Sequence, residues 1–241
     1  VLATALSPSQ AFVHDALATP TRGAWSVDAT LAYTLAATAD GGVIATVSGV
    51  GSSDEIVAIA VAQDGRERWR RALCRTDYSA PIVVDEAGNA TIVACAPARI
   101  FQLAKDGTVT RDRPLALPGK GHVRVDAVAT QGDRMVFAGQ LHDELDFAGR
   151  TFAAWDVVEG GRKSGAGDVV VLVLAGDEIV AIAHGHGREA DEVTGIAATH
   201  DGAVWVVGNA RHELDFGDGK AIAADAHERG RGFVARIELA R

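Results

Sequence analysis

The chain has 241 residues, of which 48% are hydrophobic, and it carries a formal net charge of −9. This length allows one large all-β domain or two smaller domains with a substantial core. The acidic balance argues against binding to nucleic acid or to an anionic membrane. No apolar run approaches the roughly 20 residues that a membrane-spanning helix needs, so we expect no membrane insertion.

Residues 1–22 form an N-terminal extension that does not share the sequence pattern of the rest of the chain. Ser7, Pro8 and Gln10 are typical of a helix start, with a capping hydroxyl, a proline in the first turn and a glutamine three residues after the cap. They predict a short helix, although the apolar pair at residues 12–13 fits a strand equally well.

A repeated unit of strands and turns begins near residue 31. Thr38, Val84, Thr130 and Thr199 are equivalent points in it, and the steps between them are 46, 46 and 69 residues. Asp-Gly pairs mark hairpin turns between the strands. Units of about 40–50 residues are typical of one four-stranded propeller sheet each. The predicted blades cover approximately residues 31–74, 80–118, 123–186 and 193–241.

The third and fourth units share a longer motif. Residues 130–147 align with residues 199–216 without a gap, and both segments end in Glu-Leu-Asp-Phe. The third unit also contains an excursion, residues 146–167, between its second and third strands. A chain that repeats itself in this way is built from stacked copies of one supersecondary unit.

The strand chemistry predicts how these units pack. Runs such as DVVVLVLA at residues 168–175 are apolar on both faces, so both faces must be covered. Helices could cover them, but amphipathic segments of about ten residues or more are absent between the strands. Sheets stacked around an axis cover one another instead. We therefore predict an all-β fold, a β-propeller of four four-stranded blades, with a β-sandwich or part of a larger propeller as alternatives.

The fourth predicted blade ends at its third strand, close to the end of the sequence. Residues 24–29 precede the first blade much as residues 66–73 precede the second, and Trp25 takes the place of Trp69. An outermost strand missing from a blade would leave unpaired backbone groups. We predict that residues 24–29 are an N-terminal closing strand that completes the fourth blade, so that the propeller covers residues 23–241.

Short motifs recur at the turns and strand starts of these units. They are Asp40-Gly41, Asp64-Gly65 with Trp69, Leu145-Asp146-Phe147, Asp168-Val169, Leu214-Asp215-Phe216 and Gly232-Phe233-Val234. This repeat resembles that of bacterial secreted β-propeller proteins of the SBBP-like and quinoprotein-like groups. The resemblance implies a propeller fold and an extracytoplasmic setting, but no activity. The quinone-site and metal-site patterns of the enzymatic relatives are absent, so no cofactor is expected.

Histidines near the motifs raise the question of metal binding. His142 and His212 precede the two Leu-Asp-Phe motifs but do not occupy equivalent positions, so we interpret the motif as structural, with a packed Phe and a turn-capping Asp. His184 and His186 project to the same face of a strand. The sequence shows no cysteine and no clear third ligand near them, so we predict neither a metal site nor catalytic residues.

The chain has two cysteines, Cys74 and Cys95, and we predict that they form a disulfide. Cys74 lies in the connection that enters the second blade, and Cys95 lies near the end of that blade's second strand. Because the first two strands are antiparallel, both thiols should lie at one end of the sheet. Pairing is expected in an oxidising compartment.

Five arginines surround Trp69 in an otherwise acidic protein, at positions 66, 68, 70, 71 and 75. They could form a site for an acidic partner. The stronger interpretation is that they lie on the outermost strand of the first blade, where charged side chains prevent edge-to-edge pairing.

Two long loops, residues 146–167 and 215–232, suggest a binding function, because loops of this length are usually functional or disordered. We predict a non-enzymatic extracytoplasmic propeller that binds a protein or polysaccharide partner, or that is a structural component of an assembly. The alternative is a propeller hydrolase or lyase with His122, His200 and Asp201 at a central channel. The partner-binding candidates in the loops are Trp155, Asp156, Arg162, His227 and Arg229.

Overall fold

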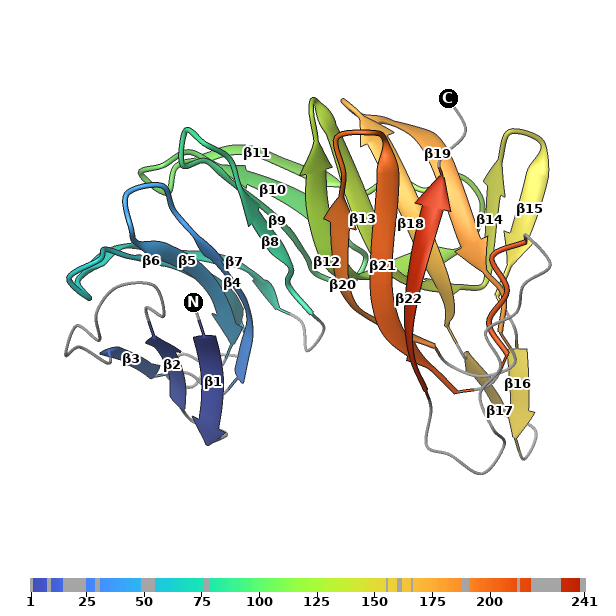
Figure 1. The fold of residues 1–241 in the computed structure, drawn as a ribbon, viewed down its shortest axis with the longest axis horizontal. Coiled ribbons are helices and arrows are strands. Elements are labelled where there is room, and N and C mark those ends of the chain that lie inside the picture. Colours follow the sequence, from blue (N-terminus) through green and yellow to red (C-terminus); the bar gives the residue numbers. More distant parts are fainter. Residues whose placement is uncertain are drawn as a thin grey trace. The chain divides into compact units, whose positions relative to one another are not determined.

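The computed structural model describes residues 2–7, 10–14, 25–28, 31–48, 55–75, 79–154, 156–159, 162–165, 167–187, 191–211, 213–217 and 231–238. Every regular element in this part of the chain is a β-strand (Figure 1). No helix long and apolar enough to span a membrane occurs among these residues. The chain divides into two compact units, unit 1 (Val1–Leu115) and unit 2 (Ala116–Arg241).

Unit 1 contains three antiparallel sheets. The N-terminal sheet has the order β1-β2-β3, blade 1 has the order β4-β5-β6-β7, and blade 2 has the order β8-β9-β10-β11. The strands are β1 (Leu2–Ser7), β2 (Gln10–His14), β3 (Trp25–Asp28), β4 (Leu31–Ala37), β5 (Val43–Ser48), β6 (Glu55–Val61), β7 (Glu67–Arg75), β8 (Ile82–Val84), β9 (Ala90–Ala94), β10 (Arg99–Leu103) and β11 (Val109–Pro114).

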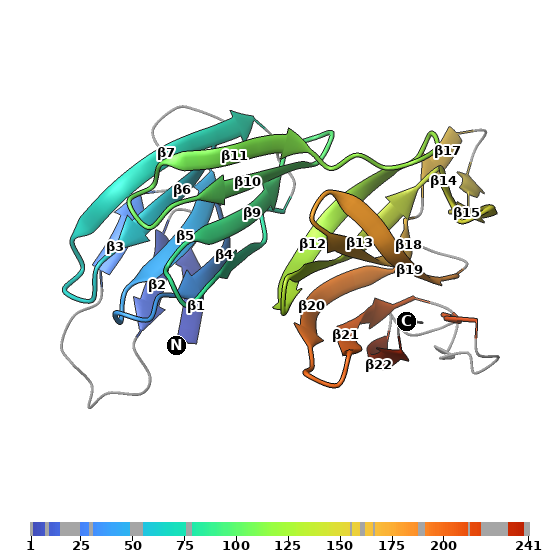
Figure 2. The same cartoon turned by 90° about the horizontal axis from the view of Figure 1, so that it is seen from above.

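Unit 2 contains two larger sheets and two hairpins. Blade 3 has the order β12-β13-β18-β19, and blade 4 has the order β20-β21-β22 (Figure 2). In the two hairpins, β14 pairs with β15, and β16 pairs with β17. The strands are β12 (His122–Gln131), β13 (Arg134–His142), β14 (Glu144–Phe147), β15 (Arg150–Ala153), β16 (Asp156–Glu159), β17 (Arg162–Gly165), β18 (Asp168–Ala175), β19 (Glu178–Gly185), β20 (Glu192–Ala198), β21 (Ala203–Ala210) and β22 (Arg231–Glu238).

The Asp-Gly pairs form the expected hairpin turns. The Asp64 carboxylate accepts a hydrogen bond from the backbone N–H of Arg66 at 3.1 Å, and the Asp106 carboxylate accepts one from Thr108 at 2.9 Å. The following glycines, Gly65 and Gly107, have φ of 85° and 81°, which residues with a Cβ rarely adopt. The Asp side chain and the glycine backbone together therefore fix the turn.

Each unit has its own apolar core. In unit 1, a core between blades 1 and 2 contains the fully buried Ile56, Ile92 and Leu103. In unit 2, a core between blades 3 and 4 contains the fully buried Val171 and Val204. The strands apolar on both faces thus supply the packing between neighbouring sheets.

Buried polar side chains tie neighbouring blades together within each unit. The Thr46 hydroxyl on β5 donates to the carbonyl of Ala80, just before blade 2, at 2.6 Å. The Gln140 amide on β13 donates to the carbonyl of Asp191, just before blade 4, also at 2.6 Å. Equivalent second strands therefore hold the start of the next blade in both units.

The predicted all-β, four-bladed β-propeller class is confirmed, with two blades in each unit and four strands in each of blades 1 to 3. Blade 4 has three strands among the described residues. The short helix predicted within residues 1–22 is wrong. Residues Leu2–Ser7 and Gln10–His14 pair as an antiparallel hairpin, so the strand alternative for residues 12–13 is correct.

The closing strand predicted at residues 24–29 is a strand, β3, over Trp25–Asp28. It pairs antiparallel with β2 inside unit 1, with Val13 opposite Trp25. It is an edge strand of its sheet, because the order is β1-β2-β3. Completion of blade 4 by these residues stays a prediction.

Candidate functional site

The outermost strands of the blades differ in their charge. Strand β7 contains four arginines, Arg68, Arg70, Arg71 and Arg75. Strand β11 contains Arg111, Asp112, Arg113 and, as its last residue, Pro114. By contrast, β19, the edge strand of blade 3, has no charged residue and no proline between Ile179 and Gly185. Charges and proline on an edge strand oppose pairing with another chain. Of these three strands, only β19 lacks both charge and proline along its edge, although a register shift at Val180 interrupts its pairing with β18.

A pocket of about 860 Å³ runs along β19 within unit 2. We call it the β19 groove. Five successive residues of the strand, Val180 to His184, line the groove, and so does His186 just beyond its end. The β14–β15 hairpin contributes Phe147, Arg150 and Phe152, and Phe216, Arg236 and Glu238 also line the groove.

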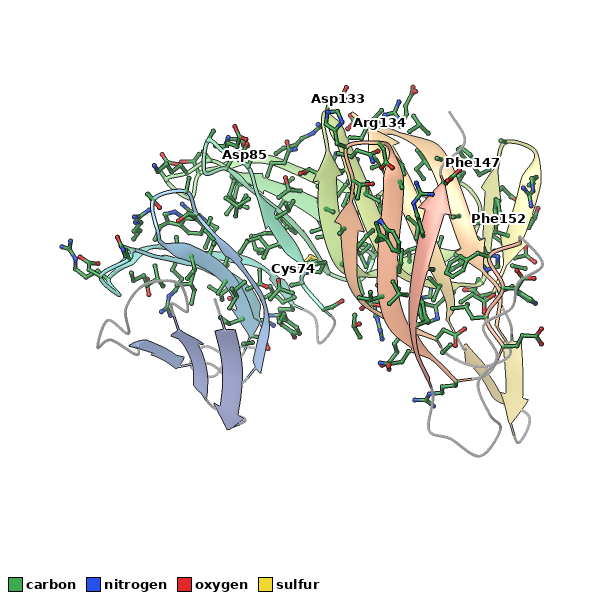
Figure 3. The ribbon with its side chains drawn as sticks, in the orientation of Figure 1. Cys74, Asp85, Asp133, Arg134, Phe147 and Phe152 are labelled. Atoms are coloured by element: carbon green, nitrogen blue, oxygen red, sulfur yellow. A yellow bond between two sulfur atoms is a disulfide. The ribbon has the colours of Figure 1, made fainter. Side chains whose placement is uncertain are left out.

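The β14–β15 hairpin is held in place by the first Leu-Asp-Phe motif. Leu145 is fully buried, and the Asp146 carboxylate accepts a hydrogen bond from the Thr151 hydroxyl at 2.7 Å across the hairpin. Phe147 and Phe152 lie on this hairpin (Figure 3). The guanidinium carbon of Arg150 lies 5.1 Å from the centre of the Phe152 ring, a cation–π contact.

The second Leu-Asp-Phe motif supports β19 directly. Leu214 is fully buried, and the Asp215 carboxylate caps the turn by accepting a bond from the backbone N–H of Gly217 at 2.7 Å. The backbones of His186 and Asp215 exchange two hydrogen bonds, of 2.8 and 3.0 Å. The structural role predicted for the motif agrees with these contacts.

Three polar side chains meet at one end of the groove. Nε2 of His184 lies 2.9 Å from Oδ2 of Asp168, and Nδ1 of His186 lies 3.2 Å from the same oxygen. Asp168 is fully buried, whereas the side chain of His184 is 11% exposed and that of His186 is 54% exposed. The three donor atoms all lie within 4.8 Å of one another, a spacing that could hold a metal ion. We call this group the Asp168 cluster.

Sequence reasoning missed Asp168 as the third member of this group. The pairing of β18 with β19 places Val169 opposite Gly185, so Asp168 reaches the same face as the two histidines. A register shift near the turn, where Val173 pairs with Ala181 and Leu174 with Ile179, decides that face.

The residues proposed for an enzyme do not form one site. His122 begins β12, whereas Gln131 at the other end of the strand donates a hydrogen bond to the carbonyl of Thr199, beside His200. Nine residues at about 3.3 Å each separate the two ends by roughly 30 Å. His122 instead stacks on His142, with ring centres 4.7 Å apart. Asp201 accepts a hydrogen bond from Thr199 and pairs with Arg236.

The loop candidates are only partly described. The predicted loop at residues 146–167 contains strands of two hairpins rather than irregular chain. Asp156 and Arg162 are the first residues of β16 and β17. Trp155, His227 and Arg229 lie outside the described residues, as does most of the second loop.

The predicted disulfide between Cys74 and Cys95 is present in unit 1, with Cα atoms 6.0 Å apart (Figure 3). It joins the end of β7 to the end of β9, and it is compatible with an extracytoplasmic location.

The region around Trp69 has structural roles. Trp69 Nε1 donates to the carbonyl of Lys105 at 2.9 Å, and Arg71 donates to the carbonyl of Gly107 at 3.0 Å. Arg68 forms an ion pair with Asp40. These contacts fit the edge-strand interpretation.

No known protein family matches the sequence, and no curated protein matches it. Comparison with solved structures finds matches of low similarity, three of which follow. A protein of unknown function from Bacteroides caccae has a TM-score of 0.40 and 14% identity over 95% of this chain and 86% of its own. Streptogramin B lyase has a TM-score of 0.39 and 15% identity over 82% of this chain and 69% of its own. Pyrococcus horikoshii acylaminoacyl peptidase has a TM-score of 0.44 and 16% identity over 80% of this chain, which spans only 32% of that enzyme.

Proposed function

We propose that this protein is a non-enzymatic, extracytoplasmic binding propeller that takes an extended segment of a partner protein into the β19 groove. The observation that carries the proposal is the edge of β19, which has neither a charged residue nor a proline between Ile179 and Gly185. An extended peptide adds to such an edge through backbone hydrogen bonds, and side pockets select its alternate side chains.

The walls of the groove suit a peptide. Phe147, Phe152 and Phe216 supply apolar surface at its sides, and Arg150 supplies positive charge. The charge of Arg236 is balanced by ion pairs with Asp201 and Glu238. Val180, on the strand itself, is 41% exposed. The seven residues from Ile179 to Gly185 extend over about 23 Å at roughly 3.3 Å each, which matches a peptide of about seven residues. The Cys74–Cys95 disulfide supports an oxidising, extracytoplasmic setting for such an interaction.

The test is selection of peptides from a displayed random library, followed by measurement of their dissociation constants. Val180→Lys should weaken binding of the selected peptides by about tenfold or more, about 1.4 kcal/mol, because it places a charge on the edge that the peptide must pair with. The matched control is Val109→Lys on the outer strand β11, where Val109 is 38% exposed. This control should bind as the unmodified protein does.

Hydrogen exchange supplies a second readout, because backbone amides of β19 should gain protection when the peptide binds. Binding to immobilised polysaccharides in the absence of any peptide binding would overturn the proposal and favour a polysaccharide partner. Equal loss of binding in both lysine variants would also overturn it, because the effect would then not be specific to the edge of β19.

A further inference from the structure

We propose that the Asp168 cluster is a binding site for a divalent transition-metal ion of the zinc class. Its ligands would be Oδ2 of Asp168, Nε2 of His184 and Nδ1 of His186. This inference does not rest on peptide binding to the groove, although the cluster lies at one end of it.

The separations of the donor atoms fit a small coordination sphere. Zinc–nitrogen and zinc–oxygen bonds of about 2.0–2.2 Å at tetrahedral angles place neighbouring ligand atoms roughly 3.3 Å apart. The two histidine nitrogens lie 2.9 and 3.2 Å from Oδ2 of Asp168. An ion could therefore replace the two shared hydrogen bonds with little movement of the side chains.

The second observation is the state of the Asp168 carboxylate. Asp168 is fully buried, and its Oδ1 atom has no hydrogen-bond partner among the described residues. Buried charges in proteins are normally paired or coordinate a metal. A divalent ion bound at Oδ2 would compensate this carboxylate, and the nearby Oδ1 could share in the coordination.

The ligand types select the class of ion. Two imidazoles and one carboxylate suit zinc and neighbouring transition metals, whereas magnesium and calcium prefer ligand sets made only of oxygen. The rings of His184 and Phe152 form a T-shaped pair, with ring centres 5.8 Å apart. His186 is 54% exposed, which leaves a position open on the solvent side for water or an outside ligand. Three protein ligands with an open fourth position form an accessible site rather than a closed structural one.

The experiment titrates zinc chloride alone into the chelator-treated, full-length protein by calorimetry, and cobalt absorption reports coordination by histidine. We expect one zinc ion per chain at micromolar affinity or tighter. Because Asp168 is buried, variants of the two histidines carry the test. Loss of an outer-shell partner weakens metal binding by about 10–100-fold. His184→Asn and His186→Asn each remove a direct ligand, so each should weaken zinc binding by more than this.

The matched control is His122→Asn, which removes an exposed histidine from the other histidine pair of unit 2. It should leave the affinity for zinc unchanged. Absence of stoichiometric binding, or equal affinity in all three variants, would overturn the proposal and leave a purely hydrogen-bonded cluster. Peptides are titrated separately in chelator, so failure of the zinc site and failure of the groove can be told apart.

Discussion

At the scale of single residues, two glycines of the repeat are required by backbone packing. Gly139 on β13 and Gly208 on β21 are equivalent positions, 69 residues apart. A Cβ on Gly139 would overlap the carbonyl oxygen of Arg124, and a Cβ on Gly208 would overlap that of Glu192. Both lie beside a register shift in the preceding strand. The bulge thus pushes a carbonyl into the space that glycine leaves.

Gly139→Ala and Gly208→Ala should each lower the free energy of unfolding by about 1–3 kcal/mol or more, because a backbone carbonyl must move. Gly232→Ala is the control, since its nearest atom to an added Cβ is 3.9 Å away. Urea denaturation measures all three. A cost as large in the control as in the other two would show that loss of glycine itself, rather than the close carbonyl, is responsible.

The same kind of irregularity explains why the Asp168 cluster could not be predicted. Counting outward from the turn at Gly176 and Asp177 places Asp168 opposite Gly185, on the face away from the histidines. Val180 is an extra residue that shifts the register, and Asp168 therefore reaches the histidine face. This single bulge changes the face on which Asp168 is expected, and the residue types of the hairpin do not indicate that a bulge is present. Cys74 and Cys95 were predictable because regular antiparallel pairing was enough to bring them together.

At the scale of elements, the aspartates in the hairpin turns stabilise the blades in their ionised form. A hydrogen bond from the backbone of Arg66 holds the pKa of Asp64 below its usual value, and one from Thr108 does the same for Asp106. The hydroxyl of Thr199 lowers the pKa of Asp201. Each of these turns joins two strands of a blade, so the ionised carboxylate stabilises the hairpin.

These pKa shifts predict loss of stability in acid. A carboxyl group whose pKa is lower in the folded state binds fewer protons there, so its contribution is complete above the unfolded pKa of about 3.9 and is lost as pH falls below it. The melting temperature should therefore drop below about pH 4. In the double variant Asp64→Asn, Asp106→Asn this drop should be smaller, because asparagine accepts the same bonds without titrating. An identical pH profile in the variant would contradict the role of these turns.

The positions of the hairpins were predicted best where the turn residues have clear local preferences. Asp-Gly pairs located the first and last hairpins of blade 1 and the last hairpin of blade 2, because the aspartate and the glycine each satisfy a local requirement. The excursion at residues 146–167 has weaker signals, and its strands β14 to β17 are only four residues each. In residues 1–22 the local preference for a helix cap was overridden by strand pairing between β1 and β2.

At the scale of the whole molecule, the chain has two compact units with separate apolar cores. Leu103 belongs to the core of unit 1 and Leu214 to the core of unit 2, and both are fully buried. Because neither core shares a residue with the other, local opening of one unit need not expose the core of the other.

Matched core substitutions test this independence. Leu103→Ala and Leu214→Ala should each cost about 2–5 kcal/mol, since each removes buried methyl groups and leaves a cavity. Hydrogen exchange measured by mass spectrometry should rise about 30-fold or more in Val1–Leu115 for Leu103→Ala and in Ala116–Arg241 for Leu214→Ala, with wild-type protection in the other unit. A rise across the whole chain in both variants would mean that the four blades open as one cooperative unit, and the division into separately stabilised halves would then be wrong.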